Sequence, residues 1–309
     1  MKLFDGHCDT LLALRFSRQP AGALYRNSLH VDLERGLSLG GYAQFFAIFG
    51  TPEFVRDGED LFDLFYGRFL EELEACGDHM AFCRTGSEAD AAVAGGKAAA
   101  FLSVEGAEVL NCDPKRLEQA AEKGVRSLCL TWNRATALCG TNVQDPDRGL
   151  SAAGKDFVRL GEELGLILDV SHLSDPGFWD LEKLVKGPFA ATHSNSRAIH
   201  EHTRNLTDDM FRAIRDHGGA AGLNLYTAFL GEGEVTIETV VRHLEHFLDL
   251  GGEKTVAMGG DLDGCESLPR GMSGVQDVKL LEQELQKRGY PQDLLDDLFF
   301  NNWRRVVGD

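Results

Sequence analysis

Short apolar runs alternate with longer amphipathic stretches along almost the whole chain. The short runs are rich in β-branched and aromatic residues, which is typical of strands. They predict eight strands, at residues 3–9, 42–49, 98–105, 125–132, 166–172, 189–193, 220–226 and 255–261. The stretches between them place apolar residues at helical spacing. They predict helices at residues 58–75, 114–123, 151–164, 175–185, 207–217, 236–249, 274–288 and 291–300.

The alternation of strand and helix predicts a parallel sheet, because each helix carries the chain back to the start of the next strand. The strands are continuous apolar runs, so both faces of the sheet are expected to be covered. These features favour a closed (β/α)8 TIM barrel over an open, doubly wound sheet. The length of 309 residues fits one such barrel with insertions. Since no linker, repeat or low-complexity segment interrupts the chain, residues 1–309 are expected to form a single domain.

Composition is typical of globular proteins, with 43% hydrophobic and 26% charged residues. The formal net charge of −18 argues against nucleic acid and anionic membrane as partners, because both favour Lys and Arg. No apolar run has the length of a transmembrane helix or a signal peptide. The seven cysteines form no CxxC pair, which indicates reduced thiols and a cytoplasmic protein. The oligomeric state stays open, with a homodimer among the alternatives.

Polar residues that could bind metal recur where the predicted strands end. In a barrel these ends form one face, and that face carries the active site. His7 and Asp9 are two residues apart on the first strand, so both side chains can point into the barrel mouth while Cys8 points away. An isolated pair of this kind is also compatible with ordinary hydrogen bonding. Its interpretation therefore depends on the other strand ends.

Three further residues end apolar strands: Glu105, His172 and His193. Glu108, in the loop after Glu105, is expected to be a surface residue. A buried carboxylate needs a partner, and its two oxygens can bridge two ions. Together with His7 and Asp9, these residues predict a two-metal centre that could acidify a water molecule. Imidazole and carboxylate suit zinc, with manganese and iron as alternatives.

Two other sets of residues complete this interpretation. Asp261 ends the last strand and is predicted to carry a proton from water to a leaving amine, with Asp263 as a lesser candidate. His243 and His246 lie within an amphipathic helix and are expected to be structural. The chain contains no GxSxG elbow, P-loop or Rossmann fingerprint, which argues against serine hydrolases and nucleotide-binding enzymes.

Seven motifs, in this order, resemble those of the membrane dipeptidase (renal dipeptidase) family of metallopeptidases. They are DGHCD at 5–9, SVEG at 103–106, LTWN at 130–133, LILDVSHLSD at 166–175, THSNSR at 192–197, RN at 204–205 and GGDLDG at 259–264. The resemblance covers nearly the full length and implies a (β/α)8 barrel with two zinc ions per chain.

The resemblance also implies a role for individual residues. His7 and Asp9 would hold one zinc, His172 and His193 the other, and Glu105 would bridge them. Asp261 would be the catalytic acid and base. Arg204 would bind the substrate carboxylate, for which a planar guanidinium is well suited, and Tyr226 would line the pocket.

The chain departs from the mammalian family pattern at one substrate-binding position. Leu-Thr-His is replaced by Leu-Thr-Trp, so that Trp132 stands where the family has a histidine near the scissile carbonyl. Tryptophan offers a single N–H donor and more bulk. The replacement bears on substrate preference and rate, while the metal ligands and Asp261 are retained.

The predicted function is hydrolysis of dipeptides, with L-Xaa-D-Xaa substrates included, by hydroxide held between two zinc ions. One alternative is another amidohydrolase-type barrel enzyme, such as a lactonase, cyclic amidase or deaminase. Many of those enzymes bridge their metals with a carboxylated lysine, so Glu105 favours the dipeptidase. The other alternative is a catalytically silent barrel that binds metal or peptide, for which Trp132 is the sole support.

Overall fold

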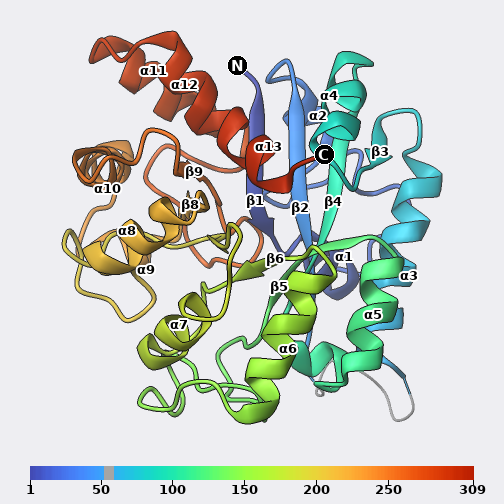
Figure 1. Cartoon of the computed structure of the whole chain (residues 1–309). Coiled ribbons are helices and arrows are strands. Elements are labelled where there is room, and N and C mark those ends of the chain that lie inside the picture. Colours follow the sequence, from blue (N-terminus) through green and yellow to red (C-terminus); the bar gives the residue numbers. More distant parts are fainter. Residues whose placement is uncertain (52–58) are drawn as a thin grey trace.

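The computed structural model describes residues 1–51 and 59–309 and shows a closed barrel of parallel strands surrounded by helices (Figure 1). β1 pairs with β9 at one side of the ring and β2 pairs with β4 at the other, which closes it. The predicted (β/α)8 fold is confirmed. The barrel strands are β1 (Leu3–Cys8), β2 (Tyr42–Phe49), β4 (Ala98–Glu105), β5 (Val125–Cys129), β6 (Ile167–Asp169), β7 (Ala190–Ala191), β8 (Ala220–Leu223) and β9 (Val256–Met258).

The helices of the outer layer follow most of the predicted segments. Thr207 accepts a hydrogen bond from the backbone N–H of Met210 and caps α8, which fits its place before two acidic residues. Gly58, the first residue of the predicted helix 58–75, lies outside the described residues. The α-helices are α1 (Thr10–Phe16), α2 (Leu33–Leu37), α3 (Leu61–Ala75), α4 (Gly86–Ala94), α5 (Pro114–Glu122), α6 (Ala152–Glu163), α7 (Asp175–Glu182), α8 (Asp208–Asp216), α9 (Thr227–Leu230), α10 (Ile237–Asp249), α11 (Lys279–Lys287), α12 (Gln292–Asp296) and α13 (Asn302–Val307).

Several short elements differ from the prediction. The segments α1, α2, α4 and β3 (Met80–Phe82) were not predicted, and β3 pairs with the first half of β4. The C-terminal region is divided more finely than two helices. A short helical turn, η3 (Val275–Val278), leads into α11, and another, η4 (Asp297–Asn301), joins α12 to α13. A further turn, η2 (Ala107–Leu110), follows β4.

Six strands end earlier than predicted, β1 at Cys8, β8 at Leu223 and the other four at Cys129, Asp169, Ala191 and Met258. Most of the residues that follow them are still buried, so burial does not mark where these strands end. They nevertheless leave the ladder and turn into the barrel mouth. The predicted endings at Trp132, His172, His193 and Asp261 were therefore wrong for the strands, and these four residues lie in the loops at the carboxyl face.

The opposite end of the barrel is closed by aromatic packing. Phe4, Phe45 and Phe101 lie inside the barrel with ring centroids 5.1–5.8 Å apart. Trp303 of α13 packs beneath them, and its indole N–H donates to the Met258 carbonyl at 2.6 Å. Figure 1 shows α13 at the end where β1 and β2 begin. Among the described residues, this end of the barrel is therefore filled by side chains.

Two expectations from composition can also be compared with the fold. All seven cysteines are free thiols, as their spacing predicted. Within residues 1–51 and 59–309, the helices are too short or too polar to cross a lipid bilayer.

Candidate metal centre and active site

His7 and Asp9 lie at the carboxyl end of β1 and point into the barrel mouth. His7 Nε2 is 3.4 Å from Asp9 Oδ2, while Cys8 is fully buried in the core, as predicted. The pairing of β1 with β2 shifts register between Asp5 and Cys8, an irregularity that re-aims side chains. Asp5 supports this bend, because its carboxylate accepts from the backbone N–H groups of His7 and Gly260.

Glu105 lies between two groups of side chains and faces each with a different oxygen. Oε2 is 3.3 Å from His7 Nε2. Oε1 is 2.9 Å from His172 Nε2 and 3.7 Å from His193 Nε2. Three candidate ligand sets result, each with its donor atoms within 4.8 Å of one another, and two of them share Glu105: His7, Asp9 and Glu105; Glu105, His172 and His193; and His7, His193 and Asp261. The structure thus brings together all five predicted ligands, with Glu105 shared.

The orientation of His193 follows from two buried neighbours. The Thr192 hydroxyl donates to Asp169 Oδ2 at 2.5 Å, so its oxygen accepts from Nδ1–H of His193 at 2.8 Å. Asp169 is held in turn by Ser171, whose backbone N–H and hydroxyl both donate to Oδ1. The proton of His193 is therefore on Nδ1, and Nε2 presents a lone pair to Glu105 and His172.

His172 is oriented in the same way. Its Nδ1–H donates to the side-chain oxygen of Asn133 at 3.1 Å, so its Nε2 is also unprotonated. The Nε2 atoms of His172 and His193 are 3.0 Å apart. Two lone pairs at this distance repel each other unless a cation lies beside them. The arrangement suits a metal ion bound by both imidazoles.

Two further observations show that this donor set fits metal. His7 Nε2 and Asp9 Oδ1 are buried, and neither has a hydrogen-bond partner among residues 1–51 and 59–309. An orphaned buried polar atom is costly, and a metal ion would satisfy both. Imidazole nitrogens and carboxylate oxygens are ligands that zinc accepts.

The electrostatics of the cluster also favour a cation. Burial raises the pKa of Glu105 to about 7, and the nearby charges of Asp9 and Asp261 act in the same direction. Burial likewise raises the pKa of Asp261 to about 6. Burial lowers the pKa of His172 and of His193 well below the usual value, so both rings are neutral at pH 7. Positive charge supplied from outside would relieve the carboxylates without competing with these rings.

Asp261 follows β9 and faces the same cluster in an unusual backbone conformation. Its φ of 54° lies in the left-handed region, which aspartate tolerates better than most residues. Asn224 donates to Asp261 Oδ2 at 3.0 Å. A Cβ atom on Gly264 would lie 2.1 Å from Asp9 Oδ2 and 2.6 Å from Asp261 Oδ1, so only glycine fits there. Asp261 is thus fixed beside the candidate ligands.

The carboxylates of Asp263 and Glu108 lie in environments that differ from those predicted. Asp263 accepts from the Thr10 hydroxyl at 2.6 Å and from the His30 backbone N–H at 2.6 Å, which joins β9 to the loop before α2. Its role in the structure is to connect these segments. Glu108 was expected to be a surface residue, and this was wrong. It is half-buried beside Gly106, and burial raises its pKa to about 7.

Arg204 is a buried cation on the far side of the cluster, only 4% exposed. Its Nη1 donates to the Ser171 carbonyl, and its Nη2 donates to His172 Nε2 at 3.1 Å. The guanidinium also lies over the Phe229 ring, 5.3 Å from its centroid. Arg204 shares a pocket with Glu105 and Asp261, so the predicted anchor and the predicted proton carrier face the same space.

That pocket has a volume of about 340 Å³. Trp132 and Phe49 form one aromatic side, with ring centroids 4.8 Å apart. Tyr226 lines another side, and its hydroxyl donates to Glu266 at 3.2 Å. The volume is within the range of small-molecule sites. Polar groups that could bind a peptide lie at the floor of the pocket, and its walls are apolar. Such a pocket suits a small peptide.

Sequence comparison decides the family. The family model of the membrane dipeptidases, peptidase family M19, matches residues 1–309. The chain belongs to the membrane dipeptidase family. An uncharacterized dipeptidase of Schizosaccharomyces pombe is 30% identical over 303 residues, which are 90% of this chain and 72% of that relative.

Solved structures of this family have the same fold. A metallopeptidase from Rhodobacter sphaeroides, liganded with a phosphinate mimic of the dipeptide L-Ala-D-Ala, is 32% identical, with 99% of this chain and 98% of that chain covered and a TM-score of 0.89. A second M19 dipeptidase is 33% identical with the same coverage and TM-score. Membership makes this chain a metallo-dipeptidase, a hydrolase.

Several residues of the site were missed as functional by sequence reasoning. Asn133, Thr192 and Asp169 orient the two histidines, Asn224 contacts Asp261, and Gly264 leaves room for two carboxylates. All of them except Asn224 lie inside the recognised motifs, and Thr192 directly precedes a predicted ligand. A search for hydroxyl, amide or carboxylate groups within three residues of each predicted histidine would have found Thr192 and Asp169.

Proposed function

We propose that this metallo-dipeptidase holds two zinc ions and hydrolyses dipeptides, including those with a D-residue at the C-terminal position. The observation that carries the proposal is Glu105, whose two oxygens face two separate ligand sets at the floor of a peptide-sized pocket. His7 and Asp9 would hold one ion, and His172 and His193 the other. Two histidines with unprotonated Nε2 atoms support zinc over the harder divalent ions.

The metal ions would polarise the scissile carbonyl and make a water molecule more acidic. The protein supplies the rest of the chemistry. Asp261 is fixed beside the ligands by Asn224 and is proposed to take the proton of the attacking water and deliver it to the leaving amine. Arg204 is proposed to bind the substrate's C-terminal carboxylate, since it is a buried cation that lines the pocket.

The aromatic wall is proposed to set the side-chain preference. Trp132 packs against Phe49, and its bulk narrows the pocket on that side. Its indole can donate one hydrogen bond, whereas the family histidine could also carry a charge. Tyr226 lines the opposing part of the pocket. The preference for a D-residue is supported by the L-Ala-D-Ala mimic bound to the Rhodobacter sphaeroides relative.

The test is turnover of an L-Xaa-D-Xaa and L-Xaa-L-Xaa dipeptide library by zinc-loaded protein, together with zinc content. We expect about two zinc ions per chain and hydrolysis of some members. Asp261→Asn should lower kcat by ~10²–10⁴-fold, as loss of a general acid or base does, without loss of zinc. The matched control is Asp156→Asn on the outer face of α6, which should leave both unchanged. Bound zinc with no turnover of any member contradicts the proposal.

A further inference from the structure

Arg204 lies in a loop between β7 and α8 that has no regular helix or strand. A binding arginine in such a loop needs support from elsewhere, because a long side chain on an irregular backbone has many conformations. Part of this support is at the guanidinium itself, where Nη1 donates to the Ser171 carbonyl and lies 3.5 Å from the Ser194 hydroxyl. Those contacts hold the head of the side chain. The backbone on either side of Arg204 is held by another residue.

That residue is Arg197. Its Nε donates to the Asn205 carbonyl at 2.8 Å, and its Nη2 donates to the Thr203 carbonyl at 3.3 Å. These carbonyls belong to the two residues that flank Arg204 in the chain. The backbone N–H of Arg197 also donates to the Leu206 carbonyl at 2.8 Å. One guanidinium therefore holds the chain on both sides of the proposed carboxylate anchor.

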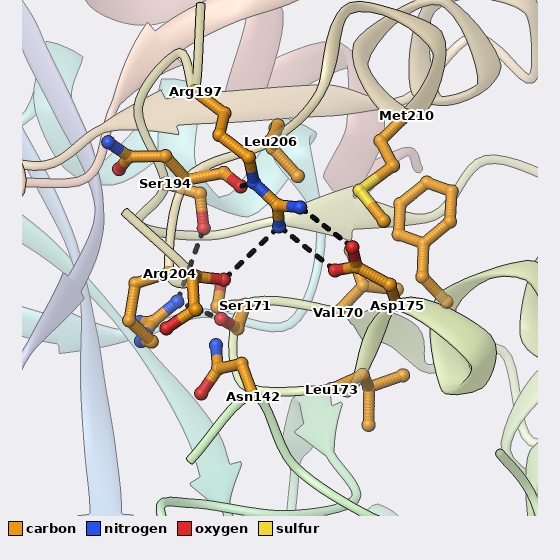
Figure 2. A pocket seen from close by; sticks show the side chains of 13 residues that line it. Asn142, Val170, Ser171, Leu173, Asp175, Ser194, Arg197, Arg204, Leu206 and Met210 are labelled. Atoms are coloured by element: carbon orange, nitrogen blue, oxygen red, sulfur yellow. Dashed lines mark hydrogen bonds and ion pairs between the residues drawn. The ribbon is translucent and has the colours of Figure 1, made fainter. Parts of the chain in front are cut away.

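Asp175 fixes Arg197 from the other side (Figure 2). The carboxylate oxygens accept from Nη1 at 2.7 Å and from Nη2 at 2.9 Å, which is a bidentate pair. Asp175 is the first residue of α7, and the side chain of the preceding Ser174 caps this helix. Through this pair the loop is attached to a helix of the barrel. Because Asp175 is 45% exposed, the pair contributes more to geometry than to stability.

The space between the two arginines is nearly filled. A cavity of about 10 Å³ separates Arg197 and Asp175 from Arg204, Ser171 and Ser194, and Figure 2 shows these side chains around it. This volume is about that of one water molecule. Arg197 therefore limits the space beside Arg204 on this side.

We infer that Arg197, held by Asp175, is a positioning residue that aligns Arg204 for a substrate carboxylate. The inference rests on the proposed carboxylate-binding role of Arg204. It is specific, because Arg197 lies on the side of Arg204 away from the candidate metal ligands and lines no part of the substrate pocket within the described residues. Its loss should weaken the carboxylate contact and leave the metal-directed contacts of a ligand unchanged.

The test compares two ligands that differ only at the C-terminus. The zinc-loaded protein is titrated calorimetrically with a phosphinate mimic of L-Ala-D-Ala and with the C-terminal amide of that mimic. Wild type should bind the acid more tightly than the amide, and Arg204→Gln should abolish this preference. Arg197→Gln should reduce it by about tenfold, since small displacements of a positioned group have effects of this order. The Kd of the amide should not change.

Asp175→Asn is the second variant, because it keeps the shape of the pair and lies at an exposed position. It should lower the acid-to-amide preference in the same direction, with a nearly unchanged melting temperature. The matched control is Arg212→Gln, which breaks an exposed pair with Asp209 on α8 and should change neither Kd. A merely structural role for Arg197 would weaken both ligands alike.

Three results would overturn the inference: an unchanged preference in both folded variants, equal weakening of acid and amide, or no preference in wild type. Hydrolysis of L-Ala-D-Ala by wild type is measured separately. Absence of turnover together with a preference that depends on Arg197 would contradict the proposed dipeptidase reaction and support the positioning role.

Discussion

The two ends of the barrel are built from the same strands and have opposite chemistry. β1 carries Phe4 near its start and His7 near its end, and β4 carries Phe101 and then Glu105. At the first end the aromatic rings contact each other and Trp303. At the second end the histidines and carboxylates converge on one another. A few residues along a strand separate a region that supplies stability from a region that supplies chemistry.

The two ends differ in whether their buried polar groups find hydrogen-bond partners within the described part of the protein. The aromatic end pairs the indole N–H of Trp303 with the Met258 carbonyl, and the buried Asn302 amide likewise donates to the Val256 carbonyl. The carboxyl end leaves His7 Nε2 and Asp9 Oδ1 without a hydrogen-bond partner among the described residues, and it buries three carboxylates together. A bound cation would stabilise such an arrangement. Substitutions at the carboxyl end should therefore affect metal binding, and substitutions at the aromatic end should affect the free energy of unfolding.

The largest effect is expected from Glu105→Gln. This change keeps the shape and removes the charge shared by two of the candidate ligand sets. We expect kcat/KM to fall by at least ~10³-fold, because loss of supporting partners alone costs 10- to 100-fold. Zinc content, measured by atomic emission, should fall below that of wild type. Glu108→Gln is the matched control, since Glu108 is half-buried nearby and belongs to neither set. Full zinc content in Glu105→Gln would contradict a shared ligand.

Trp303→Ala tests the aromatic end. Removing this buried ring should lower the free energy of unfolding by about 3–5 kcal/mol, measured by urea denaturation of metal-free protein. The fraction that remains folded should bind zinc with wild-type stoichiometry. Trp179→Ala on α7, where the ring is partly exposed, should cost less. Loss of zinc binding from the folded Trp303 variant would show that the two ends are not independent.

Thr192→Val should have an intermediate effect at the carboxyl end. The substitution removes the hydroxyl that links His193 to Asp169 and keeps the volume. Zinc affinity, measured by chelator competition, should fall by about 10- to 100-fold. Thr255→Val, at the start of β9 on the opposite end, is the isosteric control and should leave the affinity unchanged. Equal affinities in wild type and Thr192→Val would argue against the hydroxyl as the group that orients the ring.

The smallest effect is a pH dependence from His243. Its Nδ1 accepts from the Ser196 backbone N–H, and its Nε2–H donates to the Leu230 carbonyl, so the neutral ring supports the loop after β7. Burial lowers its pKa to about 4, with His200, Arg242 and His246 contributing, although the bond to Leu230 opposes this.

The pKa of His243 in the unfolded chain is near 6.5. As the pH falls, the imidazole is therefore protonated in the unfolded chain before it is protonated in the folded protein. The contribution of the neutral His243 ring to the free energy of unfolding is complete above pH 6.5 and decreases toward pH 4. Between pH 7 and pH 5 the loss should be about 2 kcal/mol. Urea denaturation of metal-free wild type and His243→Gln at both pH values isolates this contribution, because the other histidines are common to both proteins. Identical pH dependences would contradict it.

Much of the fold could be predicted from the sequence because the strands of a barrel are buried on both faces. All eight barrel strands were predicted in order, since strands buried on both faces are continuous apolar runs. Their ends were not, because the loops carrying His172, His193 and Asp261 are as buried as the strands. Helix α4 was missed because its alanine-rich sequence has little contrast between its faces. The candidate ligands could be predicted because they follow strands that end on one face.

The partners of those ligands could not be predicted in the same way. The contact between Asp169 and Thr192 joins residues of two strand units, and the support of Arg204 by Arg197 depends on how a loop folds back on itself. Periodicity carries no information about such contacts. The replacement at Trp132 was visible in the sequence, but its packing on Phe49 required the structure.

The pairing of β1 with β9 places the beginning and the end of the chain at one seam of the barrel. His7 and Asp9 emerge from the ribosome more than 250 residues before Asp261 and Gly264. A nascent chain that ends at α10 carries all five candidate ligands and lacks the strand that closes the ring. Until β9 docks, nothing holds Asp261 beside Asp9. The complete site, with Asp261 beside the five candidate ligands, is therefore assembled only when the ring closes.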